Sequence, residues 1–320
     1  MEEPHDFWLV PGGRQNKNEQ IKRQRGNTCC ADRRKRHRRG ALLGFDFEIG
    51  QDTAFSEDLL KIGRKLVTKI FNASKFASIQ FPSLKAKPVS AAEDIKAGII
   101  SEPLDLWVLT RLKKAVEKAT VEFTAYEYSD ARVAIEDFFW NDFCDNYLEM
   151  VKTRAYNEAD EKGRQSALHT LYHCLETVLR LFAPYVPHIT EEVYAHIFEE
   201  KFAKTKSLHG RNSWPLAKDY SSDEKAERAG IYAREILDFV RKIKAEAGVS
   251  IKWPLTYLNI EAGSEGGKKD EIKGVFSDLA GVTGATKTEW KVGAMGSKTY
   301  ETSDKKFKVH ILLAAESNVA

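Results

Sequence analysis

The segment 129–151 constrains the fold most, because apolar side chains recur at helical spacing along its whole length. The apolar positions are Ala131, Ala134, Ile135, Phe138, Phe143, Tyr147, Met150 and Val151. A charged flank accompanies them, made of Arg132, Glu136, Asp145, Glu149 and Lys152. Such a helix owes most of its stability to the packing of its apolar face. The segment therefore predicts a helix that packs with one side and exposes the other.

Helical periodicity also dominates much of the chain on either side. The predicted helices cover 56–78, 103–123, 167–182, 190–201 and 221–247. Pro103 lies near a helix start, and Ser221 with Glu224 forms a capping-box pattern. Gly163 is interpreted as a break between helices, and Thr190 as the start of a short one. Because short links join long amphipathic helices, we predict a mainly α fold, an antiparallel helical bundle.

The pattern changes after Pro254, where apolar residues begin to alternate with polar ones. The predicted strands cover 255–260, 286–292 and 307–313, with a helix at 268–280 between the first two. The sequence therefore predicts a small C-terminal α+β unit. The expected domains are an irregular basic segment at 1–43, the helical bundle at 44–250 and the α+β unit at 251–320.

Composition limits the class of protein. A chain of 320 residues can hold about two domains, and 42% hydrophobic residues suffice for a sizeable core. No apolar run approaches the roughly 20 residues of a membrane span, and no signal peptide is recognisable, so we expect a soluble, cytoplasmic protein. The four cysteines, two of them adjacent, show no Cys-x-x-Cys spacing. We therefore expect free thiols and no structural metal.

Positive charge is concentrated at the N-terminus. Residues 1–39 hold 11 basic and 5 acidic residues, a net charge of +6, which leaves −3 for the rest of a chain whose total is +3. The run 33–39 reads Arg-Arg-Lys-Arg-His-Arg-Arg. Such a run is typical of a disordered tail, a nuclear signal or an RNA-binding arm. The body of the chain has no basic excess that would indicate broad affinity for nucleic acid.

Five segments in a fixed order carry a family resemblance. They are Gly50–Glu57 with Lys69–Ala73; Phe138–Glu149, which reads Phe-Phe-Trp-Asn-Asp-Phe-Cys-Asp-Asn-Tyr-Leu-Glu; Phe182–Glu192; Ser213–Pro215; and Ile243–Glu246. Together they resemble the valyl-tRNA synthetase family of class I aminoacyl-tRNA synthetases, in its archaeal and eukaryotic-like form. The resemblance extends from about Gly44 to Ala262, and the second segment is the one that distinguishes the valine enzymes from their isoleucine and leucine relatives.

The resemblance implies a role in tRNA binding. In this family such a bundle follows the catalytic domain and binds the anticodon stem and loop, here of tRNA(Val). The full enzyme uses ATP and Mg²⁺ to join valine to tRNA, but its catalytic Rossmann domain and editing domain lie upstream of the bundle. This chain contains neither, and no Gly-x-Gly-x-x-Gly or P-loop motif occurs. We therefore expect no cofactor, no catalytic residue and no aminoacylation by this chain alone, and a separate catalytic portion as a second partner.

The N-terminal segment looks like an out-of-frame translation. The family places a Lys-Met-Ser-Lys-Ser loop before the Gly50 segment, whereas 17–25 read Lys-Asn-Glu-Gln-Ile-Lys-Arg-Gln-Arg. Codons allowed for these residues, read one nucleotide later, can encode Lys-Met-Ser-Lys-Ser-Lys-Gly-Asn. We therefore hypothesise that about 14–40 are frame-shifted, which would make the basic run a by-product. The gene sequence tests this hypothesis, since codons incompatible with that motif would exclude it.

The helix at 129–151 and the residues just after it supply the candidate RNA contacts. Proteins read unstacked bases by stacking and by hydrogen bonds to base edges, while Lys and Arg hold phosphates. The predicted nucleic-acid-binding residues are Arg132, Trp140, Asn141, Lys152 and Arg154. Lys152 and Arg154 could instead complement the dipole at a solvated helix end. The phenylalanines at 138, 139 and 143 are assigned to the core.

Metal and catalytic sites are not expected. His169 and His173 stand four residues apart but show no second suitable pair of ligands, and Cys144 and Cys174 fit helical cores. The histidines before helix and turn positions, such as His188, suit backbone hydrogen bonds better than catalysis.

Two non-enzymatic alternatives remain. One is a stand-alone helical RNA-binding or scaffolding protein, distinguished by whether an adjacent reading frame encodes a catalytic half. The other is a nucleic-acid protein that binds through its basic tail, for which deletion of 1–43 abolishes RNA binding. The synthetase interpretation predicts little change on that deletion.

Overall fold

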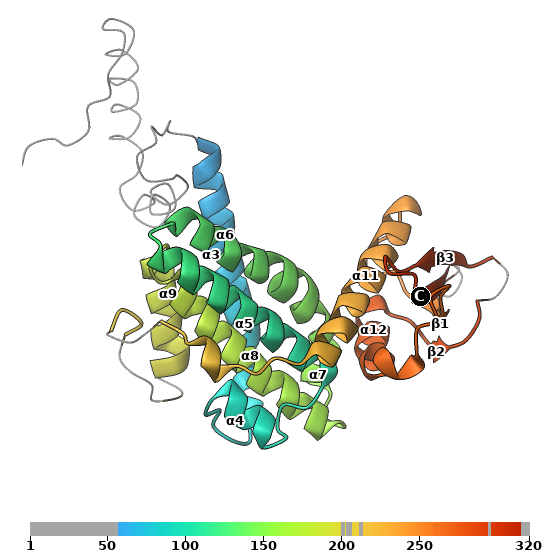
Figure 1. The fold of residues 1–320 in the computed structure, drawn as a ribbon, viewed down its shortest axis with the longest axis horizontal. Coiled ribbons are helices and arrows are strands. Elements are labelled where there is room, and N and C mark those ends of the chain that lie inside the picture. The colour runs from blue at the N-terminus through green and yellow to red at the C-terminus, as the bar shows by residue number, and fades with distance from the viewer. Residues whose placement is uncertain (1–56, 200–201, 203–206, 211–213, 294–295, 315–320) are drawn as a thin grey trace, which may run out of the picture.

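The computed structural model describes residues 57–199, 202, 207–210, 214–293 and 296–314 (Figure 1). The basic run, the frame-shift hypothesis and the helix start expected at Ser56 lie outside the described residues. Within those residues, no helix combines the length and the apolar character needed to cross a membrane.

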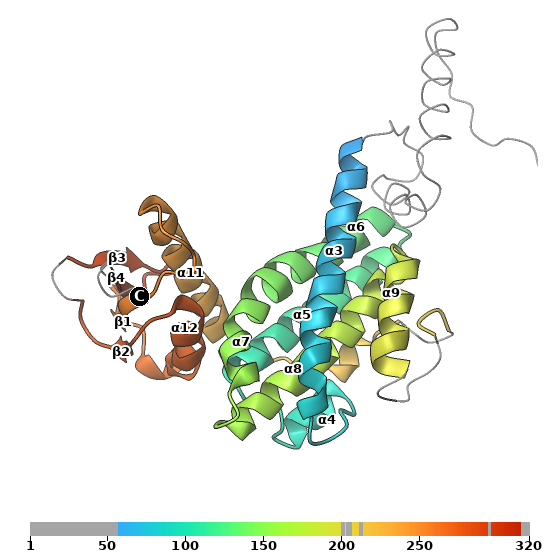
Figure 2. The same cartoon turned by 180° about the vertical axis from the view of Figure 1, so that it is seen from behind.

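The larger part of the molecule is a helical bundle, as predicted (Figures 1 and 2). Its helices are α3 (Glu57–Gln80), α4 (Ala91–Lys96), α5 (Pro103–Thr124), α6 (Tyr128–Asp137), α7 (Leu148–Tyr156), α8 (Glu161–Phe182), α9 (Pro187–Tyr194) and α11 (Glu224–Glu246). Helix α8 is the central element, because every side chain from Ser166 to Leu179 is buried. Helices α3, α4, α5, α6, α7 and α9 all contact it.

The segment predicted as one helix at 129–151 is helical throughout but changes type in its middle. Residues Phe138–Tyr147 form a π-helix between α6 and α7, with the backbone N–H of Leu148 donating to the carbonyl of Phe143, five residues earlier. The side chains of Phe138, Phe139 and Phe143 are buried, which confirms their assignment to the core. A π-helical stretch is rare and often marks a functional site.

Gly163 lies inside α8, so the predicted helix break at this position is wrong. The helix begins at Glu161, and the Asp160 carboxylate caps it by accepting from the Gly163 N–H at 3.1 Å. A Cβ at position 163 would lie 2.3 Å from that carboxylate and 3.1 Å from the Arg154 side chain. Any larger residue at this position would collide with the capping carboxylate and with the Arg154 side chain, which explains the glycine.

Two other helix starts differ from the prediction. Helix α9 begins at Pro187, and the Thr190 hydroxyl donates to the Val186 carbonyl within the first turn. Helix α11 is capped by Asp223, whose carboxylate accepts from the Ala226 N–H at 2.8 Å. Helix α9 thus starts three residues before Thr190 without a side-chain cap, and α11 is capped two residues after Ser221, so both helices are confirmed with shifted starts.

The C-terminal unit is a four-stranded sheet covered by a helix. Strands β1 (Leu255–Ala262), β2 (Thr288–Trp290), β3 (Lys298–Glu301) and β4 (Phe307–Leu313) lie in the order β2-β1-β4-β3, with β1 and β2 parallel and the other pairs antiparallel. The helix predicted at 268–280 consists of two 3₁₀ turns followed by α12 (Phe276–Thr283). Strand β3 was not predicted, because it is short and its first two residues are exposed on an edge.

A buried ionic cluster joins the C-terminal unit to the bundle. Arg154 of α7 donates to Asp105 of α5 at 2.6 and 2.9 Å and to Asp278 of α12 at 3.0 and 3.3 Å. Nearby, the Lys244 ammonium donates to the carbonyls of Ile251 and Thr283 at 2.8 and 2.9 Å. These contacts fix α12 against α7 and α11, which places the sheet beside the bundle in Figure 1.

Candidate nucleic-acid interface

A shallow hollow on the bundle surface combines an indole ring with basic side chains. It has a volume of about 350 Å³ and is lined by Arg64, Lys65, Thr68, Lys69, Asn72 and Trp140. The first five come from one face of α3, since they are spaced by three or four residues, and Trp140 comes from the π-helix beside it. The hollow therefore assembles from two segments about 70 residues apart in the sequence.

Lys69 makes a cation–π contact with the indole ring of Trp140. The Lys69 ammonium lies 5.6 Å from the centroid of the indole ring and donates to the Asp145 carboxylate at 2.9 Å. Burial lowers the pKa of Lys69, but the Asp145 hydrogen bond and nearby negative charge outweigh it, so the pKa is raised overall. Lys69 is thus a fixed positive charge that orients the ring through a cation–π contact.

Arg64 and Lys65 supply uncommitted positive charge at the rim. Both side chains are exposed, and neither has a carboxylate partner within ion-pair distance among the residues the structure describes. Both lie about two turns before Asn72, which gives a run of donors along α3. Such donors suit phosphate oxygens, which accept without sequence preference.

Asn141 is the next residue of the π-helix after Trp140. Its side chain is exposed, and its amide Nδ2 donates to the Asp137 carboxylate at 2.7 Å. The amide oxygen and the second N–H bond remain for a ligand. Asn141 directly follows Trp140 in the chain but does not itself line the hollow.

The three other predicted residues lie elsewhere or are engaged. Arg132 is buried and pairs with Glu136 at 2.7 Å, and Lys152 is about half-exposed and pairs with Glu149 at 2.6 Å. Arg154 is 7% exposed, with its guanidinium between Asp105 and Asp278. Its neighbours hold it in the junction with the C-terminal unit, so the structure gives Arg154 a positioning role there.

The α3 side of the hollow was missed in the sequence, although a pattern was present. Arg64, Thr68 and Asn72 recur every four residues, and Lys65 and Lys69 repeat the same spacing one position later. This polar stripe lies opposite the buried Leu66, Ile70 and Ala73. A polar face on a helix is usually only solvated, and what distinguishes this one is Trp140, which only the fold brings next to it.

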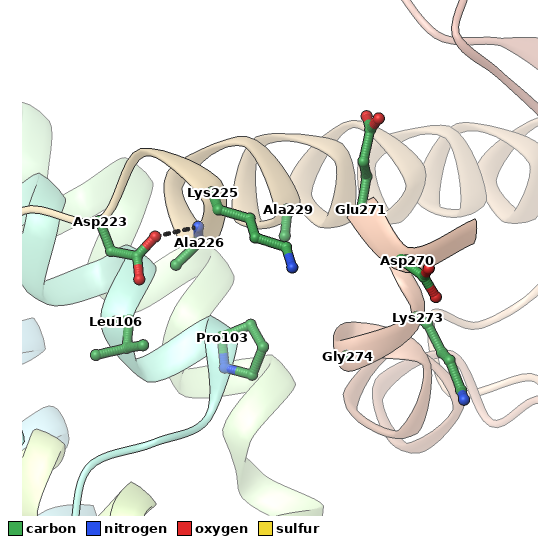
Figure 3. Close-up of a pocket in the computed structure, with 10 residues that line it drawn as sticks. All are labelled: Pro103, Leu106, Asp223, Lys225, Ala226, Ala229, Asp270, Glu271, Lys273 and Gly274. Atoms are coloured by element: carbon green, nitrogen blue, oxygen red, sulfur yellow. Dashed lines mark hydrogen bonds between the residues drawn. The ribbon is translucent and has the colours of Figure 1, made fainter. Parts of the chain in front are cut away.

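A second hollow lies at the junction of the bundle and the C-terminal unit (Figure 3). It has a volume of about 580 Å³, and its walls come from the starts of α5 and α11 and from residues 270–274. Its charged lining residues are Asp223, Asp270 and Glu271 against Lys225 and Lys273. Because carboxylates outnumber lysines, this hollow does not suit a phosphate backbone.

Comparison with known proteins agrees with a tRNA-binding bundle. Residues 105–260 match the family described as the anticodon-binding domain of tRNA ligase. The chain is similar to the valine–tRNA ligase of Wolbachia sp. subsp. Brugia malayi, with 39% identity over 265 residues, covering 82% of this chain and 29% of that protein. The valine–tRNA ligase of Rickettsia rickettsii is 40% identical over 276 residues, covering 83% and 30%.

A third relative, the valine–tRNA ligase of Anaplasma marginale, is 42% identical over 212 residues, covering 66% of this chain and 24% of that protein. The chain thus spans less than a third of the length of these relatives. These three relatives do not test whether the chain has the archaeal and eukaryotic-like form of the enzyme, which stays a prediction. Over the matched residues the chain belongs to the valine–tRNA ligase family, and residues 105–260, from α5 into β1, form an anticodon-binding domain of the tRNA ligases.

Proposed function

We propose that this chain binds tRNA(Val) and that its bundle holds the anticodon stem and loop. It would act as part of a cytoplasmic valine–tRNA ligase, whose catalytic portion attaches valine to tRNA with ATP and Mg²⁺. The observation that carries the proposal is the hollow where Trp140 meets Arg64, Lys65, Lys69 and Asn72. The family match supports it, because its description names anticodon binding.

The hollow has the groups that single-stranded RNA requires. An unstacked base can lie on the partly exposed indole of Trp140, since base–aromatic stacking tolerates every base. The amides of Asn72 and Asn141 can donate to and accept from base edges, which supplies selectivity. Arg64 and Lys65 can neutralise the phosphates on either side of the stacked base. Trp140, Asn141, Arg64 and Lys65 are therefore the contacts we propose, with Lys69 fixing the ring.

Removing the rim charges should weaken binding without changing its selectivity. We expect Arg64→Ala and Lys65→Ala each to reduce the slope of log K against log salt by about 0.7–1, because each removes one phosphate contact. The affinity for any tRNA should fall by a similar factor. Fluorescence anisotropy over a salt series measures both quantities.

Lys87→Ala is the matched control for these two variants, because Lys87 is exposed beyond the other end of α3. We expect its salt slope to equal that of the unchanged protein. Equal slopes in all four proteins would remove Arg64 and Lys65 from the interface.

A further inference from the structure

Two histidines and an aspartate meet in the interior, away from the proposed RNA surface. His169 and His173 lie one turn apart on α8, and Asp94 faces them from α4. The Asp94 Oδ2 atom lies 2.8 Å from His169 Nδ1 and 2.7 Å from His173 Nε2. All three potential ligand atoms lie within 4.8 Å of one another, and all three side chains are buried. The sequence could not show this cluster, because Asp94 is 75 residues from the nearer histidine.

We propose that Asp94, His169 and His173 bind a divalent transition-metal ion, with Zn²⁺ as the best-suited ion. Two histidines four residues apart on a helix place both imidazoles on one face, a spacing that zinc sites use. Two imidazole nitrogens and one carboxylate oxygen are ligands that Zn²⁺ accepts, and such three-residue sets leave a fourth position for water. The site would connect α4 to α8 and so fix the 84–100 connection against the centre of the bundle.

The hydrogen-bonded cluster can convert to a metal site with a small rearrangement. Around a tetrahedral Zn²⁺ with bonds of about 2.0–2.1 Å, ligand atoms lie roughly 3.3–3.4 Å apart, so the two N···O distances must each widen by about 0.6 Å. The ring N–H protons that now point at Asp94 must also leave. In a neutral imidazole the proton moves to the other ring nitrogen, and from a protonated imidazole it is released to solvent.

The carboxylate of Asp94 and the cavity beside His173 both suit the binding of a cation by these three side chains. The Asp94 Oδ2 atom lies against both imidazoles, so an ion bound here would be held by one carboxylate oxygen and two ring nitrogens. A polar cavity of about 150 Å³ borders His173, so one of the three proposed ligands lies next to a space that water can enter. The charged groups that line that cavity are Glu176 and Arg180, which pair at 2.8 Å, and Asp219.

The test is the stoichiometry of metal binding by the full chain. The protein is freed of metal with a chelator and titrated with Zn²⁺ by calorimetry, and Co²⁺ is then used as a spectroscopic probe. We expect one equivalent of Zn²⁺, a Zn²⁺-dependent rise in Tm, and Co²⁺ bands of a tetrahedral nitrogen and oxygen site without thiolate charge transfer. Failure to bind Zn²⁺, or a thiolate band, would overturn the proposal, whatever the variants do.

Variants assign the ion to these side chains. Because the N-terminal segment has Cys29, Cys30 and His37, all proteins carry Cys29→Ser, Cys30→Ser and His37→Ala. In this background Asp94→Asn, which preserves shape, and His173→Ala should each lose the bound equivalent and the Tm rise. The control His209→Ala changes an exposed histidine and should retain both. Binding that persists in Asp94→Asn and His173→Ala would show that the ion lies elsewhere.

Discussion

Trp140→Ala should weaken tRNA(Val) binding by about 5- to 150-fold, because stacking of one base on an aromatic ring is worth about 1–3 kcal/mol. Among the residues that the structure describes, Trp140 is the one aromatic residue lining the hollow beside α3. Its removal takes away the platform and leaves Lys69 without its cation–π partner. Equilibrium binding of fluorescent tRNA by the full chain measures the loss. The salt slope should stay unchanged, because no phosphate contact is removed.

Tyr156→Ala is the matched control for Trp140→Ala. Tyr156 is 58% exposed and is located at the end of α7, outside the lining of the hollow. The Tyr156→Ala substitution removes an exposed aromatic ring that does not line the hollow, so this variant should bind tRNA as tightly as the unchanged protein. If both variants bind as the unchanged protein does, the proposed stacking platform is wrong. Circular dichroism of both variants excludes loss of the bundle as the cause of any weakening.

Arg154→Ala should cost about 3–5 kcal/mol of unfolding free energy, the usual penalty for removing one partner of a buried ionic cluster. The change would leave the carboxylates of Asp105 and Asp278 buried without their cation. Asp105 keeps hydrogen bonds from Tyr147 at 2.8 Å and Ser166 at 2.5 Å. Asp278 loses the partner that joins it to the bundle, so the C-terminal unit should detach first. Urea unfolding followed separately by tryptophan fluorescence and circular dichroism measures the loss.

The control is Lys152→Ala, two residues earlier on the same helix. Its side chain is 45% exposed and its ion pair with Glu149 is on the surface, so the change should cost less than about 1 kcal/mol. Arg154→Ala combined with Asp278→Asn should be more stable than Arg154→Ala alone, since no charge then remains on the α12 side. Equal stability of Arg154→Ala and the unchanged protein would contradict the role assigned to this cluster.

The Arg154→Ala penalty should depend on pH. Burial raises the pKa of Asp278 to about 6 even though Arg154 lowers it, so removal of Arg154 should raise that pKa further. A folded-state pKa above the unfolded value means that the folded protein binds the proton more tightly. The variant therefore regains stability as pH falls toward 5, and the difference from the unchanged protein is larger at pH 7.5. A penalty equal at both pH values would show that Asp278 is not the group responsible.

Local sequence patterns predicted most of the helices, because each buries an apolar stripe that recurs at a period near 3.6. The errors occurred where tertiary contacts decide. Gly163 lies in the first turn of α8, where Asp160 caps the helix and leaves no room for a Cβ. The apolar spacing of Phe138–Tyr147 does not distinguish a π-helix from an α-helix, and strand β3 is an exposed edge without alternation.

Of the candidate RNA-binding surface, the sequence predicted the residues of the π-helix but not those of α3. Trp140 and Asn141 could be identified because their segment is distinctive, whereas Arg64 and Lys65 become informative only once α3 lies beside the π-helix. Arg154 was expected at an RNA surface, since a basic residue near a helix end is usually solvated. Its partner Asp278 is 124 residues away in the sequence, so no local pattern could predict that ion pair.

The affinity of the full chain for two matched transcripts tests the central claim most directly. One transcript is tRNA(Val), and the other is identical except for a substituted anticodon. Losing one set of base-edge hydrogen bonds costs about 1–3 kcal/mol, so the valine anticodon should bind at least about fivefold tighter in moderate salt. Equal affinity for the two transcripts would contradict anticodon recognition by this bundle.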